Sequence, residues 1–223
     1  MIKKVKDGRY YLCMKNIDET DPFSKSCTGY DSQNQNQTIN ARMFKKILGK
    51  KVGQEKKYMD DIEAYCMQLR SDLSFSNNHT IKYIDHFETK HFLYLITDHQ
   101  DSGTLLNEEV RREYKPFLEE EVIEIVYQIL LGLTPYHAEN RMLNIISSEN
   151  IYIHKGLYKI GHYDQLMDIY GKNFTRKSIP LYAAPESFYG EKPIGPLVDV
   201  WCLGCLAHTL LFGNRHNDKV NTM

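Results

Sequence analysis

The chain has 223 residues, of which 42% are hydrophobic, which is enough for one large domain or two small lobes with a packed core. Its 28 lysines and arginines nearly balance 29 aspartates and glutamates, so bulk charge favours neither nucleic acid nor an anionic membrane as a partner. No apolar run reaches the ~18–20 residues of a membrane span and no signal-peptide core opens the sequence, so we expect a cytoplasmic protein.

The N-terminal part of the sequence predicts a small sheet. The polar run DSQNQNQ is expected as a hairpin loop, and residues 55–69 are expected as a helix. Five stretches have the composition and turn-rich flanks of strands: 10–17, 25–31, 38–48, 81–89 and 91–99. We therefore expect a five-stranded lobe with one helix.

Helices are predicted in the C-terminal part. The stretch VDVWCLGCLAHTLLFG is apolar nearly all the way round, so we expect a helix buried on every side, with Cys202 and Cys205 as buried thiols rather than metal ligands or a disulfide. An earlier helix is expected to pack on one face because its apolar residues have helical spacing: Val122, Ile125, Val126, Ile129, Leu130 and Leu133.

Three motifs follow one another in a specific order. The stretch LYLITDHQDSGTL is followed by YAAPES, which contains A-P-E at 184–186, and then by VDVWCLGCL, with Asp199 at its start. In this order the motifs resemble the eukaryotic protein kinase domain over about residues 9–214. In that family Asp199 would bind backbone amides of the catalytic loop.

The resemblance implies an α+β, kinase-like two-lobe fold. A five-stranded N-lobe with one helix would span residues 9–100, with its hinge at 98–100. A mainly helical, partial C-lobe would span 101–214, truncated before the family's last helices, and a tail would span 215–223. Glu186 would then lack the arginine that those helices supply, so the chain is a fragment, or another segment covers Glu186, or Glu186 faces water.

The resemblance also assigns a nucleotide cleft. We expect Lys45 at the strand-three lysine position, with Met43 there instead if Ala41 is the motif's alanine. The helix glutamate would fall near Asp61 or Glu63. The positions that would face a nucleotide are Lys45, Thr97, Asp98, His99 and Gln100.

The phosphate-covering loop departs from the family's glycine-rich pattern. Its glycine positions hold Glu19, Asp21 and Ser24. Carboxylates oppose an approaching phosphate, and side chains hinder the close backbone contact that glycine permits. We therefore expect ATP to bind weakly or in another pose.

The catalytic motifs depart from the family pattern as well. When H-R-D-L-x-x-x-N is laid on LNIISSEN, Ile145 replaces the catalytic aspartate and Asn150 is retained. Losing such a base costs roughly 10²- to 10⁴-fold in rate. His162 replaces the metal-binding aspartate of D-F-G, which leaves Asn150 and the displaced Asp164 as metal candidates. We expect no tightly bound cofactor, and only weak binding of ATP and Mg²⁺.

These features predict a pseudokinase that acts as a protein-binding or allosteric scaffold in signalling. Its partner would be another protein, such as an active kinase, and neither nucleic acid nor a membrane. The alternative is a divergent active Ser/Thr kinase that transfers the γ-phosphate of ATP to protein hydroxyls through Asp164, Asn150 and Lys45. A third interpretation is a truncated relative without a stable fold.

Overall fold

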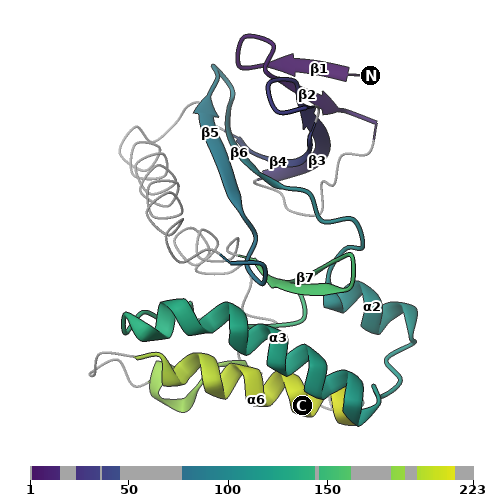
Figure 1. Ribbon diagram of the computed structural model, residues 1–223, viewed down its shortest axis with the longest axis vertical. Coiled ribbons are helices and arrows are strands. Elements are labelled where there is room, and N and C mark those ends of the chain that lie inside the picture. Colours follow the sequence, from purple (N-terminus) through teal and green to yellow (C-terminus); the bar gives the residue numbers. More distant parts are fainter. Residues whose placement is uncertain are drawn as a thin grey trace. The chain divides into compact units, whose positions relative to one another are not determined.

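The computed structural model describes residues 2–15, 24–35, 37–45, 77–143, 146–161, 182–188 and 195–213. The chain divides into two compact units. The first unit comprises residues 1–74 and 82–100, and the second comprises residues 75–81 and 101–223. Figure 1 labels most of the elements and colours the chain from its N-terminus to its C-terminus.

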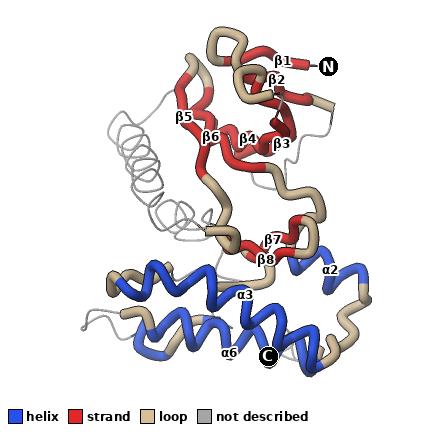
Figure 2. The backbone as a smooth tube through the Cα atoms, in the orientation of Figure 1, coloured by secondary structure: helices blue, strands red, loops and turns tan. Residues whose placement is uncertain are grey.

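The first unit is built on an antiparallel sheet of six strands, drawn in red in Figure 2. The spatial order of the strands is β1-β2-β3-β4-β6-β5. Their bounds are Ile2–Val5 for β1, Tyr10–Cys13 for β2, Ser24–Asp31 for β3, Gln37–Lys45 for β4, Tyr83–Glu88 for β5 and Phe92–Asp98 for β6.

The expectation of five strands was wrong, because β1 adds a sixth strand before residue 9. Ile2 pairs with Cys13 and Val5 with Tyr10, so β1 and β2 form a hairpin. Its turn contains Asp7 and Gly8 with φ of 52° and 83°, the left-handed region in which Asp-Gly is a favoured turn pair. The lysines within IKKV hide the strand's alternation, but the Asp-Gly pair marks the hairpin.

The other five strands are confirmed, with ends that differ by a few residues from the predicted ones. The predicted hairpin loop also forms, since Gln37 N donates to Asn34 O at 2.8 Å between β3 and β4. The helix predicted at 55–69 lies outside the described residues.

One face of this sheet carries the first unit's apolar core. Paired residues of neighbouring strands project to the same face, and alternate residues of one strand do so too. Cys27 pairs with Ala41, Ala41 with Ile96, and all three are buried. The buried cluster consists of Val5, Tyr10, Leu12, Cys27, Ile39, Ala41, Met43, Tyr94 and Ile96.

Ion pairs stabilise the β1–β2 turn. Arg9 donates to both oxygens of Asp31, with Nη2 and Oδ2 2.8 Å apart, and Asp31 is only 1% exposed. Asp85 binds Lys6 and accepts the Tyr10 hydroxyl at 2.7 Å. Because a buried carboxylate is costly without partners, these contacts fix the turn against the sheet.

The second unit combines helices with a two-stranded sheet. Thr104 caps α2, because its hydroxyl accepts from Asn107 N at 3.3 Å. The described elements are α2 at Leu105–Arg111, α3 at Glu119–Ala138, β7 at Ile151–His154, β8 at Leu157–Ile160, the 3₁₀ helix η2 at Pro185–Phe188 and α6 at Leu197–Phe212.

Helices α3 and α6 pack side by side around the second unit's core (Figure 1). The predicted one-face packing of α3 is confirmed by Val122, Ile125, Ile129 and Leu133, which are at most 3% exposed. Leu130 is an exception at 42% exposed, so its predicted place in the core was wrong.

The expectation that α6 is buried on every side was also wrong. Leu206 and Leu210 are buried, but Leu197, Trp201 and Phe212 are 75, 48 and 63% exposed. Uniform apolarity indicates that all faces could be covered, but it does not supply an element that covers them.

Residues 77–81 belong to the second unit although they precede β5. Ile81 N donates to Ile160 O and Ile160 N donates to His79 O, both at 2.9 Å, which adds this segment to the edge of β8. Gly132 permits its close approach to α3, since a Cβ there would lie 2.7 Å from His79 O. The segment is therefore part of the second unit's packing.

Replacing Arg9 by methionine should lower the free energy of unfolding by about 2 kcal/mol at pH 7, because Asp31 loses its charged donor. Arg9 lowers the pKa of Asp31 against the opposing effect of burial. A carboxyl group whose pKa is lowered in the folded state stabilises the protein at pH values above its ordinary pKa of 3.8. This stabilisation is lost as the pH falls through the folded-state pKa.

The measurement is urea unfolding of wild type and Arg9→Met between pH 3 and 7. The difference between the two proteins should shrink below about pH 4. A difference that is constant with pH would show that the Asp31 charge has no part in it.

Candidate functional site

The carboxylate of Asp199 joins three segments of the second unit. It is 0% exposed, and its Oδ2 accepts the backbone N–H of Leu143 at 2.9 Å. The same oxygen lies 2.8 Å from Nε2 of His137, near the end of α3. The prediction that Asp199 binds backbone amides of the loop after α3 is confirmed at Leu143.

Apolar side chains hold the loop on both sides of its predicted catalytic position. Leu143 and Ile146 are 3 and 2% exposed and belong to the core formed by α3 and α6. Leu143, at the position of the motif's histidine, thus packs in the core of the second unit. Asn144 and Ile145, between them, lie outside the described residues. The loop is thus held by buried side chains at Leu143 and Ile146, and the sequence has Ile145 at the position of the catalytic aspartate.

Asn150 ends this loop and directly precedes β7. It is 4% exposed, its N–H donates to Ser147 O at 3.0 Å, and its carbonyl accepts Gly161 N at 2.7 Å. The last bond places the chain just before His162 beside Asn150. Residues 162–170, including Asp164, lie outside the described residues.

The donor set for Mg²⁺ is poor. Mg²⁺ requires several hard oxygen ligands in near-octahedral geometry, and the amide oxygen of Asn150 supplies one. Within the described part of the chain, no three histidine, cysteine, aspartate or glutamate side chains group as a metal site. Of the two metal candidates, the structure thus describes Asn150 alone.

The predicted hinge already satisfies much of its own hydrogen bonding. Asp98 N donates to Lys82 O at 3.0 Å, and Asp98 Oδ1 accepts Lys82 N at 2.7 Å. Gln100 Nε2 donates to the carbonyl of Asp98 at 3.3 Å, while Gln100 Oε1 is buried with no partner. A ligand that needs the Asp98 carbonyl as acceptor must compete with the Gln100 amide.

The register of β4 places the predicted lysine on the opposite face of the sheet from Thr97. Asn40 pairs with Thr97 and Arg42 with Leu95, so Arg42 shares the sheet face of Thr97, which is 4% exposed. Met43 and Lys45 project to the opposite face, where Met43 is buried in the core and Lys45 is exposed. Sequence reasoning missed Arg42, because the one-residue shift that decides the face cannot be read from ARMFKK.

A buried carboxylate that the sequence did not signal lies on α2. Glu109 is 4% exposed, and burial raises its pKa, partly opposed by the Ser148 hydroxyl and with a smaller increase from Glu149. Tyr182 stands near the same hydroxyl, and burial raises its pKa as well. Glu109 therefore faces the loop that carries Asn150.

Several remaining residues have plain structural positions. Glu186 is exposed, which corresponds to the third of the alternatives left open for it. Cys202 is buried as expected, whereas Cys205 is only partly buried, and the cysteines at 13, 27, 202 and 205 are free thiols. No helix among the described residues is both long and apolar enough to cross a membrane.

Comparisons with known proteins identify a family. The protein kinase domain family matches residues 32–222. Serine/threonine-protein kinase PLK4 of Xenopus laevis is 26% identical over 176 residues, covering 77% of this chain and 18% of that protein. PLK4 of Drosophila virilis is 31% identical over 134 residues, covering 57% of this chain and 17% of that protein. Serine/threonine-protein kinase Nek3 of Mus musculus is 26% identical over 134 residues, covering 58% of this chain. The chain spans 17 to 26% of the length of these relatives.

Replacing Asp199 by alanine should lower the free energy of unfolding by about 3 kcal/mol, because it strands the Leu143 N–H and the His137 ring. Thermal unfolding followed by circular dichroism should then show a melting temperature lower by about 6 to 12 °C. Asp199→Asn keeps a hydrogen-bond acceptor, so its melting temperature should lie between those of wild type and Asp199→Ala. Val200→Ala, at an exposed position of the same helix, is the control, and an equal loss in it would contradict the special role of Asp199.

Replacing Glu109 by glutamine should raise the melting temperature at pH 7 by about 2 to 4 °C, the shift expected from ~1 kcal/mol in a chain of this size. The folded state raises the pKa of Glu109, so its stabilising effect is complete below the ordinary value of 4.5 and is lost as pH rises through the folded pKa. The melting temperature of Glu109→Gln should therefore rise relative to that of wild type as the pH increases.

Melting temperatures between pH 4 and 8 test this, with the exposed Glu139→Gln as the control. Parallel curves for wild type and Glu109→Gln would show that the Glu109 carboxyl is not destabilised by burial.

Proposed function

Because this chain belongs to the protein kinase domain family, we propose that it is a catalytically impaired member that acts by binding another protein. The observation that carries the proposal is the loop after α3. Asp199 and the buried Leu143 and Ile146 hold that loop in place, yet its sequence has Ile145 where the family has its proton-accepting aspartate. Support for the loop is present, and the group that would perform the chemistry is missing.

The loss of this aspartate affects the reaction itself. Phosphoryl transfer to a hydroxyl needs a carboxylate that accepts the hydroxyl proton, together with metal ions that neutralise the phosphates. An isoleucine side chain can neither accept a proton nor orient a hydroxyl. Loss of the base alone removes roughly 10²- to 10⁴-fold in rate.

Nucleotide and metal binding are proposed to be weak for three further reasons. His162 stands at the metal-binding position, and imidazole is a poor ligand for Mg²⁺. The hinge carbonyl of Asp98 is already bonded to Gln100. We infer that Arg42, on the Thr97 face of β4, takes the place of the strand lysine, and its planar guanidinium presents a different donor geometry from an ammonium.

The proposed partner is a protein, such as an active kinase or another signalling protein, and the proposed location is the cytoplasm. The near-neutral charge of the chain supports a protein partner over nucleic acid or an anionic membrane. In this role the domain acts as a scaffold or allosteric module.

A divergent active Ser/Thr kinase is the second candidate, and the names of the relatives favour it, since PLK4 and Nek3 are called serine/threonine-protein kinases. This candidate requires Asp164 and Asn150 to hold the metal that His162 does not. It predicts slow, metal-dependent transfer that is lost in Asp164→Ala.

The proposal predicts no Mg²⁺-dependent rise in melting temperature when the protein is titrated with ATP. A ligand at 100 times its dissociation constant adds about 2.7 kcal/mol, which thermal unfolding detects easily. A phosphotransfer assay on a general protein substrate should give a rate far below the roughly 1 to 100 s⁻¹ of kinases.

Asp164→Ala is the matched variant for both measurements. Transfer by wild type that needs Mg²⁺ and disappears in Asp164→Ala would establish the second candidate. A cooperative melt without any shift would support the binding module and would also argue against a chain without a stable fold.

A further inference from the structure

Helix α3 exposes a row of large apolar side chains, which we call the α3 stripe. Ile123 and Tyr127 are 60 and 56% exposed, and Leu130 and Leu131 are 42 and 37% exposed. Their spacing places them on one side of the helix, where they form a continuous row over more than two turns. Single exposed apolar residues are ordinary, whereas a contiguous row indicates an interaction site.

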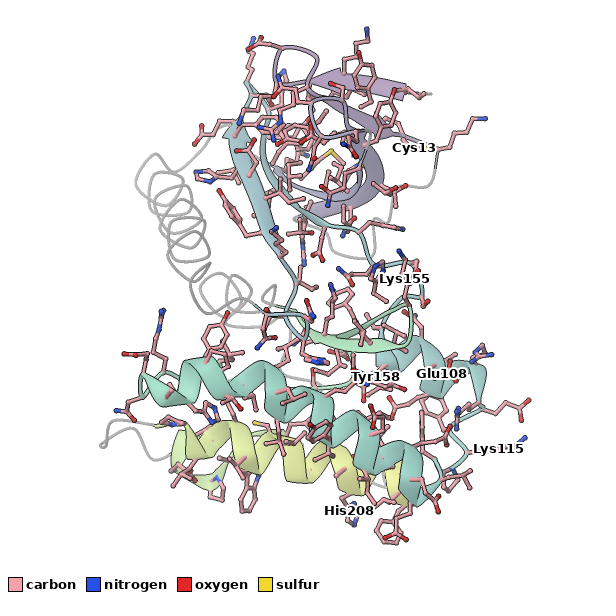
Figure 3. All side chains as sticks on the ribbon, in the orientation of Figure 1. Cys13, Glu108, Lys115, Lys155, Tyr158 and His208 are labelled. Carbon is pink, nitrogen blue, oxygen red and sulfur yellow. The ribbon has the colours of Figure 1, made fainter. Side chains whose placement is uncertain are left out.

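Among the described residues, the side chains of the stripe lie outside the core packing of α3, and at one end of the stripe the Leu131 carbonyl accepts Asn77 Nδ2 at 2.8 Å. The opposite side of α3 contains Ile125, Ile129 and Leu133, which are at most 1% exposed. That side also contacts β8, where Tyr158 N donates to Gln128 Oε1 at 2.8 Å (Figure 3). Core contacts therefore already account for the helix's buried side, and the stripe remains available.

Acidic residues flank the N-terminal half of the stripe. Glu119 and Glu120 are exposed on the same side of α3, and Glu124 is exposed at its edge, where its Oε1 accepts Gln128 Nε2 at 2.7 Å. The sequence of this helix contains no lysine or arginine. Arg112 neutralises Glu121, with Nη1 and Oε2 2.9 Å apart. Within the described ranges, no lysine or arginine forms an ion pair with the other three glutamates.

The glutamates at the start of α3 can be explained by the helix dipole or by a binding site. Glutamates in the first turn of a helix are favoured by its dipole, so they alone indicate no site. Their position beside an exposed apolar row is the additional observation. The surface is apolar along its length and negative at one end. It can therefore bind an apolar partner and favour one orientation of that partner along α3.

We propose that the α3 stripe is the docking surface for the protein partner. The partner presents an amphipathic segment with large apolar side chains along one face and lysines or arginines at the end that lies over Glu119, Glu120 and Glu124. Apolar burial supplies the affinity, while the charges set the orientation and speed the encounter. This inference rests on the proposed function as a binding module and specifies the chemistry of its partner.

Helix α6 provides a matched comparison. Val200 and Phe212 are 48 and 63% exposed, similar to the residues of the α3 stripe. Asp199 is the one acidic residue of α6 and is buried, so the helix itself provides no exposed carboxylate beside these two apolar residues. Figure 3 shows His208, also on α6, pointing away from α3. A peptide that is merely attracted to apolar surface should bind both helices.

The test uses the full chain and two synthetic fluorescent peptides. Both place leucines at helical spacing, but one carries three lysines at one end and its twin carries three glutamates there. Fluorescence anisotropy should show the lysine peptide binding about tenfold or more tightly than its twin at low salt, with the difference shrinking as salt is added. Ile123→Ser combined with Tyr127→Ser should weaken the lysine peptide about tenfold or more.

Two controls make the result specific. Glu119→Gln combined with Glu120→Gln should weaken the lysine peptide and leave its twin no weaker. Val200→Ser combined with Phe212→Ser on α6 should change neither peptide. Circular dichroism melts establish that every variant is folded.

Equal binding of the two peptides would overturn the proposal, as would equal loss in the α6 variant or no loss in the α3 variants. Self-association of wild type that the α3 variants abolish would overturn it too, because a second copy would then cover the stripe. If the peptide test fails and the protein transfers no phosphate, the docking surface is wrong and the proposed function stands. If the peptide binds as expected and the protein does transfer phosphate, the proposed function is wrong and the docking surface stands.

Discussion

The second unit depends on the buried carboxylate of Asp199. A buried charge persists only with hydrogen-bonding partners, and Asp199 has the Leu143 N–H and the His137 ring. Because these partners lie on the loop and on α3, the carboxylate sets where the loop leaves the helix. The positions of Ile146 in the core and of Asn150 directly before β7 follow from that point.

The proposed function requires that the support of the loop be separable from its chemistry. The contacts described for the loop are made at Leu143 and at Ile146, and the position of the family's proton acceptor lies between these two residues in the sequence. A substitution such as isoleucine in the middle can therefore remove a proton acceptor without disturbing the contacts at Leu143 and Ile146. The fold can outlast the reaction, and a family assignment does not by itself establish activity.

Periodicity in the sequence was sufficient to predict five of the six strands, helix α3 and the core of α6. It could not show which faces another element covers, so the exposure of Trp201 and of Leu130 was unforeseen. The motif that begins at Asp199 predicted its bond to the loop backbone correctly. Its two partners, Leu143 and His137, lie on the loop after α3 and near the end of α3 itself. The face of β4 that carries Arg42 depends on pairing register with β6, and the burial of Glu109 depends on packing, and neither is encoded in local sequence.

The segment 75–81 makes the two units inseparable along the chain. The backbone passes from the first unit to the second before Phe75, returns after Ile81, and passes again after Gln100. A fragment that begins at residue 101 would lack the strand partner that bonds Ile160 on both its N–H and its carbonyl. The second unit therefore cannot complete its fold during synthesis as an independent C-terminal module, since part of it is made before β5 and β6 of the first. Unfolding of the first unit should for the same reason perturb the second, and a single proteolytic cut after Gln100 would leave residues 75–81 of the second unit on the N-terminal fragment.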